Sequence, residues 1–191
     1  MGKTAIVFSG QGAQYPGMGK SFYDNSKVAK KLYDYAESVR PGTIAQSFEG
    51  TAEELKRTEN TQPCLYLVDI CAALALMEMG VAADGVAGFS LGEIAALAYG
   101  GAYTCEEGFS IVTRRGRYMQ QAADENDTAM AAVLKTDSTV VERICSNICS
   151  RSCTVRRFFS SPPTEKMILP ACIITSLSPS RMASFMLWVT M

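Results

Sequence analysis

Val86-Ala-Gly-Phe-Ser-Leu-Gly-Glu93 lies near the middle of this 191-residue chain. An apolar run here meets an apolar helical segment at Ser90, and a glycine stands two residues before and two residues after that serine. G-x-S-x-G between a strand and a helix is typical of a nucleophile elbow, which exposes the serine Oγ on a strained turn. Ser90 and Glu93 also fit S-x-x-E, the pattern of a helix capping box. A cap alone does not explain the two glycines, so we favour the elbow.

Strands and helices alternate around this elbow. Thr4-Ala-Ile-Val-Phe8 is an apolar run typical of a buried strand, and apolar residues recur at helical spacing from Lys27 to Ser38. Further strands are predicted at residues 85–89 and 128–134, and further helices at 61–79, at 91–99, from 104 and from 137. Strands separated by helices predict an α/β fold, with a parallel sheet and helices on both of its faces.

Two of the predicted helices carry signals at their starts. Thr61 is expected to be an N-cap, with Pro63 in the first turn of the helix. Thr104 is expected to cap a longer helix that has Glu106 and Glu107 in its first turn. Three arginines, at positions 114, 115 and 117, are expected near the end of that helix, where the helix dipole favours cations.

Composition indicates a globular protein without general affinity for nucleic acid or membranes. Hydrophobic residues make up 48% of the chain, charged residues 19%, and the net charge is −1. No apolar run approaches the ~18 residues that span a bilayer, and no signal peptide is recognisable, so we expect a cytoplasmic protein. Cys145, Cys149 and Cys153 recur every four residues, but the chain has no histidine, so we expect no metal site.

The sequence changes character near Asn147. All 15 glycines lie between Gly2 and Gly116, whereas residues 148–191 are basic, rich in serine and proline, and without lasting periodicity. Two interpretations are open: a genuine and partly disordered extension, or non-native sequence such as out-of-frame translation after a truncation. We favour the second, because composition and periodicity change at the same point.

A glycine-rich loop, Gly10-Gln-Gly-Ala-Gln14, follows the first predicted strand. It lacks the third glycine of a dinucleotide-binding fingerprint, where Tyr15 stands instead, so an NAD site is rejected. Either the loop is an ordinary glycine turn, or its backbone N–H groups approach a ligand oxygen as an oxyanion hole requires.

Together these motifs resemble the malonyl-CoA:acyl carrier protein transacylases, which are acyltransferases of fatty-acid synthesis. The resemblance runs from the N-terminus to about Asn147, and four segments carry it: Phe8-Ser-Gly-Gln-Gly-Ala-Gln14, Thr61-Gln-Pro63, Gly88-Phe-Ser-Leu-Gly-Glu93 and Arg115-Gly116. It implies an α/β-hydrolase-like acyltransferase core over 1–127. It also implies the start of a ferredoxin-like small subdomain over 128–147, followed by the atypical tail at 148–191.

The resemblance also implies roles for individual residues. Ser90 would be the nucleophile that accepts the acyl group, and the backbone amides of Gln11 and Leu91 would form the oxyanion hole. Arg115 would bind the free carboxylate of the malonyl group, a task that suits the planar guanidinium. The alternative for Arg115 is a cation at a helix end. Malonyl-CoA and acyl carrier protein would be the partners, with no metal or redox cofactor and with coenzyme A entering as the substrate thioester.

Two departures from the family pattern matter for activity. The family's elbow reads GHSxGE, whereas Phe89 replaces its histidine here. The catalytic base is a different histidine further along the family's sequence, and this chain has none. We therefore expect the N-terminal part of a transacylase, truncated and with negligible transfer of its own. Two alternatives stay open: a serine hydrolase of the α/β-hydrolase type, and an inactive module that binds coenzyme A or carrier protein.

Overall fold

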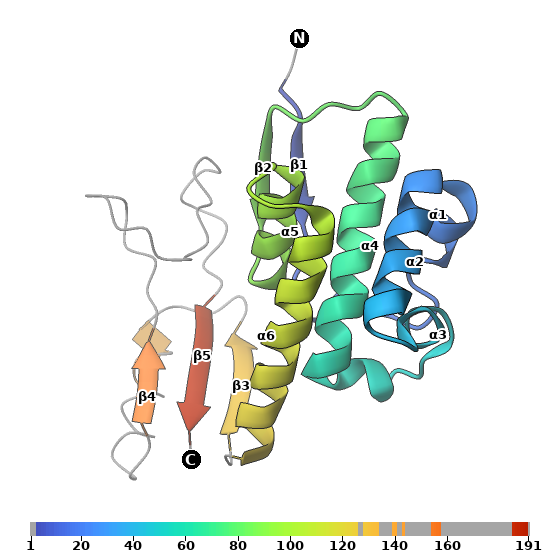
Figure 1. Ribbon diagram of the computed structural model, residues 1–191. Helices are drawn as coiled ribbons and strands as arrows, with labels where there is room; N and C mark the ends of the chain where they lie inside the picture. Colours follow the sequence, from blue (N-terminus) through green and yellow to red (C-terminus); the bar gives the residue numbers. More distant parts are fainter. Residues whose placement is uncertain are drawn as a thin grey trace. The chain divides into compact units, whose positions relative to one another are not determined.

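The computed structural model describes residues 3–125, 128–133, 139–140, 143, 154–157 and 185–190. The chain divides into two compact units, Met1–Gln120 and Gln121–Met191 (Figure 1). The elements up to the end of the long sixth helix are β1 (Ala5–Phe8), α1 (Lys20–Asn25), α2 (Lys27–Val39), α3 (Thr43–Glu49), a 3-10 turn η1 (Glu54–Lys56), α4 (Thr58–Glu78), β2 (Gly85–Gly88), α5 (Leu91–Tyr99) and α6 (Cys105–Glu125).

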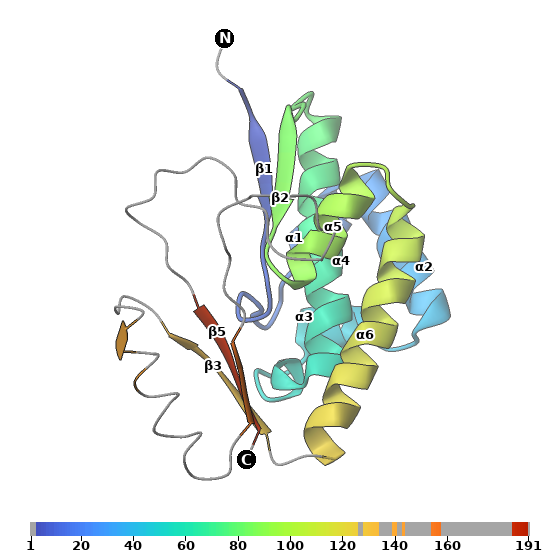
Figure 2. The same cartoon turned by 90° about the vertical axis from the view of Figure 1, so that its left-hand side faces the viewer.

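The sheet of the first unit confirms the predicted parallel α/β class. β1 pairs with β2 in parallel, with Ala5 opposite Gly85 and Phe8 opposite Gly88. The helices of the first unit lie on one side of this pair (Figure 2). Burial along β1 corrects the prediction of a buried strand: Phe8 is buried and Ile6 is half-buried, but Ala5 and Val7 are exposed, Val7 to 74%. Only one face of this strand packs on the described core. Helices on the second face stay a prediction.

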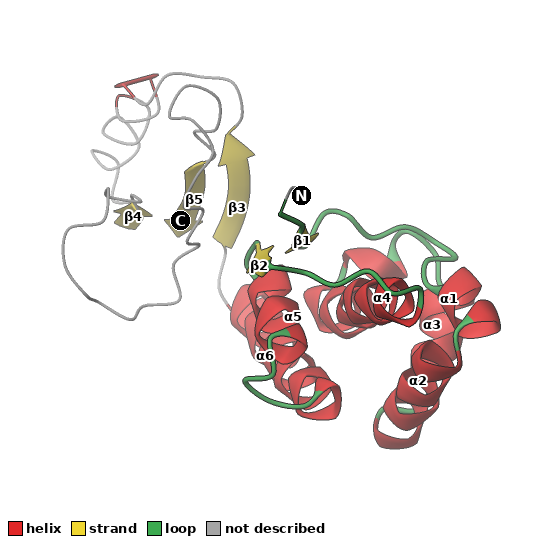
Figure 3. Ribbon diagram, turned by 90° about the horizontal axis from the view of Figure 1, so that it is seen from above, coloured by secondary structure: helices red, strands yellow, loops and turns green. Residues whose placement is uncertain are grey.

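α4 is the central helix of the first unit (Figure 3). It lies between α1–α3 on one side and α5–α6 on the other, and most of its middle turns are buried. By length and apolar composition alone α4 would suffice for a membrane span, so the sequence-based exclusion of such a segment was too strict. Its burial within the unit is that of a core helix.

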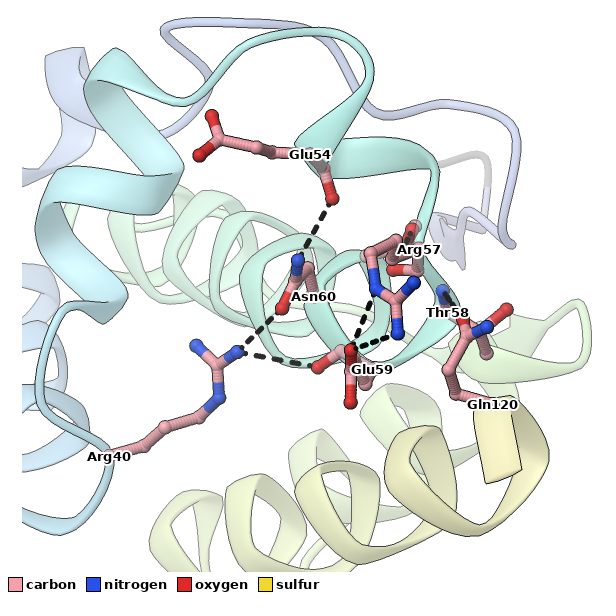
Figure 4. Close-up of polar contacts among 8 residues, drawn as sticks. Arg40, Glu54, Arg57, Thr58, Glu59, Asn60 and Gln120 are labelled. Carbon is pink, nitrogen blue, oxygen red and sulfur yellow. Dashed lines mark hydrogen bonds and ion pairs between the residues drawn. The ribbon is translucent and has the colours of Figure 1, made fainter. Parts of the chain in front are cut away.

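The start of α4 corrects a sequence prediction, because Thr61 is not the N-cap. The helix begins at Thr58 with Arg57 as the N-cap, and the Thr61 hydroxyl donates to the carbonyls of Leu55 and Arg57 instead. Pro63 therefore lies inside the helix, where its missing N–H leaves the Glu59 carbonyl without its usual partner. That carbonyl accepts a hydrogen bond of 3.4 Å from Arg40, whose guanidinium thereby compensates for the proline (Figure 4).

α6 confirms its predicted cap and corrects the interpretation of its arginines. The Glu107 N–H donates to Thr104 Oγ1 over 3.1 Å, and the Thr104 N–H donates to Glu107 Oε2 over 2.8 Å. The helix continues to Glu125, however, and its last turn carries no basic residue. Arg114, Arg115 and Arg117 thus lie in the middle of the helix, so attraction to the helix dipole does not explain them.

Several elements were not predicted from the sequence. α1 and α3 are short, and each begins after a glycine in the left-handed region, Gly19 and Gly42. Such starts carry no side-chain cap, which is the signal that sequence patterns detect. Cys145, Cys149 and Cys153 lie outside the described residues, as does most of the helix predicted from Asp137.

The second unit contains a three-stranded antiparallel sheet in the order β3-β5-β4. β3 (Thr128–Val133) and β4 (Thr154–Arg157) both pair with β5 (Phe185–Thr190). β3 lies within the predicted strand at 128–134. β4 and β5 fall within residues 148–191. The ferredoxin-like subdomain, its boundaries and the origin of the tail stay predictions.

Candidate active site

The backbone at Ser90 has the conformation of a nucleophile elbow. Ser90 has φ 54° and ψ −96°, and it is the one non-glycine residue in the described part of the chain with positive φ. Such a conformation costs about 1–3 kcal/mol and persists only where the surrounding structure holds it. Ser90 lies between β2 and α5, as the sequence predicts. An ordinary helix cap does not need this strain.

The two glycines beside Ser90 are required by close packing. A Cβ added to Gly92 would lie 2.4 Å from the Phe8 carbonyl oxygen, and one added to Gly88 would lie 2.0 Å from the Gly92 carbonyl oxygen. Both contacts are with backbone atoms, which cannot turn aside as a side chain can. The glycines therefore let the first turn of α5 pack directly on the end of β1.

The capping interaction at Ser90 exists together with the elbow. Glu93 Oε1 accepts a hydrogen bond of 3.0 Å from the Ser90 N–H, which is the carboxylate half of a capping box. The elbow and the capping box, which the sequence presented as alternatives, are thus both present. Glu93 stabilises the strained turn, and the Ser90 hydroxyl has a further partner.

That partner is Arg115 on α6. Arg115 Nη2 donates to Ser90 Oγ over 3.1 Å. Burial lowers the pKa of the Arg115 guanidinium below its ordinary value, and the nearby carboxylate of Glu93 opposes this shift. A guanidinium stays charged under such conditions. Its Nη1 is buried and has no hydrogen-bond partner among the described residues, so the guanidinium has capacity left for an anionic group.

Close packing of α6 on α4 determines where Arg115 lies. A Cβ added to Gly116 would lie 3.0 Å from the Thr58 carbonyl oxygen, so this glycine lets the two helices approach. The Thr58 N–H donates to Gln120 Oε1 over 2.8 Å (Figure 4). These contacts join α6 to the start of α4 and hold Arg115 against the elbow.

The glycine-rich loop lies against the same elbow. A Cβ on Gly10 would lie 2.5 Å from the Phe89 ring and 2.7 Å from the Phe89 carbonyl oxygen, so the loop passes directly over the residue before Ser90. Gln11 Nε2 donates to Thr58 Oγ1 over 3.2 Å, which ties the loop to α4. Phe89, which departs from the family pattern, thus packs on the loop.

The structure brings the four residues identified from the sequence to one place. Gln11 follows Gly10 on the loop that covers the elbow, Leu91 follows Ser90, and Arg115 contacts Ser90. Within the described residues, neither the Gln11 nor the Leu91 backbone N–H donates to a backbone carbonyl. Leu91 is the first residue of α5, and the N–H groups of a helix's first turn have no intrahelical partners. Their role as oxyanion donors stays a prediction.

Two further polar residues lie near the site, and the sequence assigned a role to neither, although Gln62 belongs to the Thr61-Gln-Pro63 motif. Gln62 and Asp69 lie seven residues apart on α4, and seven residues are about two turns, so they share one face of the helix. Each has a buried oxygen without a hydrogen-bond partner in the described part of the chain. A carboxylate within an apolar helical run is the signal that could have revealed Asp69.

Burial raises the pKa of Asp69 to about 6, and hydrogen bonds from the Ser9 hydroxyl and backbone act in the opposite direction. The hydroxyl of Ser9, just before the glycine-rich loop, donates to Asp69 Oδ1 over 2.9 Å. Asp69 is therefore a partly buried acid attached to the loop that covers the elbow.

Comparisons with known proteins agree with these motifs. The acyl transferase domain family matches residues 5–157. The malonyl CoA-acyl carrier protein transacylase of Bacillus subtilis (strain 168) is 38% identical over 149 residues, which are 78% of this chain and 47% of the relative. The crystal structure of malonyl CoA-acyl carrier protein transacylase from Clostridium perfringens has a TM-score of 0.76 at 28% identity, and the match covers 99% of this chain and 54% of that chain.

A solved complex of a type II PKS acyl-carrier protein with its malonyl-transacylase is also similar. Its TM-score is 0.76 at 26% identity, and the match covers 99% of this chain and 55% of that chain. The chain spans about half the length of the curated relatives it matches.

Proposed function

We propose, because this chain belongs to the acyl transferase domain family, that it carries the nucleophile and the carboxylate-binding group of a malonyl-transfer site. The donor would be malonyl-CoA and the acceptor the phosphopantetheine thiol of acyl carrier protein, as the names of its relatives suggest. Coenzyme A enters as part of the substrate, and no further cofactor is needed for acyl transfer.

The chemistry would proceed through an acyl-serine. Ser90 Oγ attacks the thioester carbonyl carbon, the C–S bond breaks, and coenzyme A leaves as the thiol with the proton that the serine gave up. In the second half the carrier thiol attacks the carbonyl carbon of the acyl-serine, the C–O bond to Ser90 Oγ breaks, and the serine takes the proton that the thiol gave up. In both halves the N–H groups of Gln11 and Leu91 would stabilise the oxyanion, and losing one such donor typically costs about 3 kcal/mol of barrier.

The contact between Arg115 and Ser90 is the observation that carries this proposal. A cation 3.1 Å from the nucleophile places a carboxylate-binding group where the far end of a short acyl chain would lie. The unpartnered Nη1 offers the second hydrogen bond of a bidentate guanidinium–carboxylate pair. A hydrolase of uncharged esters has no use for a half-buried cation at this point, so the arrangement favours the transacylase over the hydrolase.

The proton transfers need a base, and the chain contains no histidine. Removal of the base from a serine catalytic group leaves only the rate that binding and the oxyanion hole supply. We therefore expect malonyl-CoA to bind, and we expect negligible transfer by this chain alone.

Binding can be tested without the base. Calorimetric titration with malonyl-CoA and with acetyl-CoA should show tighter binding of malonyl-CoA, and Arg115→Ala should abolish the difference. Arg114→Ala is the matched control, because Arg114 lies beside Arg115 on the same helix but is exposed. Equal affinities for the two thioesters in the unaltered chain would refute the carboxylate-binding role.

Transfer is tested by incubating the chain with labelled malonyl-CoA and acyl carrier protein. We expect no labelled carrier above the level of a Ser90→Ala variant. Turnover at a rate usual for enzymes, with no added protein, would contradict the expected lack of a base. A third outcome is that the chain binds acyl carrier protein, that Ser90 is not acylated, and that malonyl-CoA binds no more tightly than acetyl-CoA. This outcome would favour the inactive binding module instead.

A further inference from the structure

We propose that Asp69 is a positioning residue, which holds Ser9 and thereby directs the Gln11 backbone N–H toward the acyl group on Ser90. The inference rests on the proposed function in one respect, because it takes the Gln11 amide as an oxyanion donor. It adds a residue on the central helix that no motif in the sequence indicates.

The geometry joins α4 to the loop at one point. Ser9 Oγ donates to Asp69 Oδ1 over 2.9 Å, although 60 residues separate the two along the chain. Ser9 comes directly after β1 and two residues before Gln11. The orientation of the Ser9 side chain and backbone therefore affects where the following peptide units point.

Ser9 is also held on its other side. A Cβ on Gly92 would lie 2.5 Å from the Ser9 carbonyl oxygen, so the Ser9 backbone is packed against the first turn of α5. The Phe89 N–H donates to the Phe8 carbonyl over 3.3 Å, one residue earlier. Ser9 thus lies between α4, which supplies Asp69, and the elbow. A change in its position would alter the distance from Gln11 to Ser90.

The carboxylate is costly at this position. Asp69 stands among Val68, Ile70 and Cys71 on a core helix, and its Oδ2 is buried without a partner in the described part of the chain. Placing a carboxyl there with one oxygen unsatisfied destabilises the fold relative to an apolar side chain. The hydrogen bonds that the Asp69 side chain accepts from described residues come from Ser9, so its visible contribution is to hold the loop.

The first test measures acylation of Ser90 by mass spectrometry, with imidazole supplied as an external base. Two acyl donors are used, malonyl-CoA and p-nitrophenyl acetate, and Ser90→Ala corrects for reaction elsewhere. We expect Asp69→Ala and Ser9→Ala each to slow acylation roughly tenfold or more, because small misplacements at a reacting centre cost this much. The double variant should be no slower than either single variant.

Two variants separate positioning from general stability. Asp69→Asn keeps an oxygen that can accept from Ser9, and it should restore a large part of the rate lost in Asp69→Ala. Asp34→Ala is the matched control, because Asp34 accepts a hydrogen bond of 3.0 Å from the Tyr23 hydroxyl on an exposed surface. Its acylation rate should stay within about twofold of the unaltered chain.

The two donors distinguish failure of this inference from failure of the proposed function. An oxyanion forms with either donor, so the Asp69 effect should be equal for both. If Ser90 shows no preference for malonyl groups but Asp69→Ala still slows p-nitrophenyl acetate, the proposed function fails and this inference holds. If Asp69→Ala and Ser9→Ala react as fast as Asp34→Ala, this inference is wrong.

Amide hydrogen exchange decides the question independently of the chemistry. The backbone amides of residues 9–13 should exchange faster in Asp69→Ala and in Ser9→Ala than in Asp34→Ala, with Asp69→Asn between them. Unchanged exchange in that segment would overturn the inference, even where acylation is too slow to measure. Ser9→Ala alone suffices if Asp69→Ala does not fold.

Discussion

Arg115 Nη2 lies 3.1 Å from Ser90 Oγ, although the two residues are 25 positions apart and are separated by α5 and the first half of α6. The contact requires two close approaches, of α5 on β1 at Gly92 and of α6 on α4 at Gly116. It gives the strained serine a cationic neighbour rather than a base. The proposed function takes this cation as the group that binds an acid beside the nucleophile, and the predictions below test that role.

Replacement of Arg115 by lysine should weaken malonyl-CoA binding about tenfold, or about 1.4 kcal/mol. An ammonium is a point charge and cannot reproduce the planar fork that contacts Ser90 and a carboxylate at once. Acetyl-CoA affinity should not change, because that substrate has no free carboxylate. Calorimetry on Arg115→Lys beside Arg114→Lys checks this, and an unchanged malonyl-CoA affinity would show that charge alone suffices.

Alanine at Gly88 should destabilise the protein far more than alanine at Gly85, on the same strand. The new Cβ at Gly88 would meet backbone atoms at 2.0 Å, whereas nothing lies within 4 Å of a Cβ at Gly85. We expect a loss of about 3 kcal/mol in the free energy of unfolding for Gly88→Ala and a change within about 0.5 kcal/mol for Gly85→Ala. Urea denaturation of both variants measures the difference, and similar midpoints would contradict the packing argument.

Stability should fall as pH rises between pH 5 and pH 7. The pKa of Asp69 is raised from 3.8 to about 6 in the folded chain, so the folded state binds a proton more tightly than the unfolded state. The stabilisation is therefore greatest when Asp69 is protonated and is lost as pH rises through about 6. The chain has no histidine to titrate in this range.

Urea denaturation at several pH values between 5 and 7 measures this effect. Glu37, Glu54 and Glu107 have lowered pKa values, so they are ionised throughout this range and do not obscure it. Asp69→Asn should remove most of the pH dependence, because asparagine does not titrate. A midpoint that rises with pH in the unaltered chain would contradict the prediction, and the same fall in Asp69→Asn would show that Asp69 is not the group responsible.

Loss of the cap on α6 should cost about 1 kcal/mol of stability in Thr104→Ala. The substitution removes the oxygen that accepts from the Glu107 N–H, and it leaves that N–H to water. Thr104→Ser keeps an oxygen in the same place and should lose much less. Chemical denaturation compares the two variants, and equal losses would mean that the threonine methyl group matters more than the hydrogen bond.

Much of the local structure could be predicted from the sequence. The strand before the glycine-rich loop, the elbow, the helix Leu91–Tyr99 and the cap at Thr104 agree with the structure. The start of α4 was misplaced because the hydroxyl of Thr61 donates to the carbonyl of Leu55, which lies on a preceding turn. A sequence pattern cannot distinguish that hydrogen bond from a cap.

Sequence alone determined the backbone of the elbow. Glycines at 88 and 92 permit the close packing that Ser90 needs, and steric exclusion of a Cβ depends on a few neighbouring residues. Only the tertiary structure decided that Arg115 contacts Ser90 and that Asp69 holds Ser9, with its pKa raised to about 6. The two contacts join residues that are 25 and 60 positions apart in the chain, and the raised pKa depends on how deeply Asp69 is buried. Both the contacts and the burial arise from the packing of α4, α5 and α6.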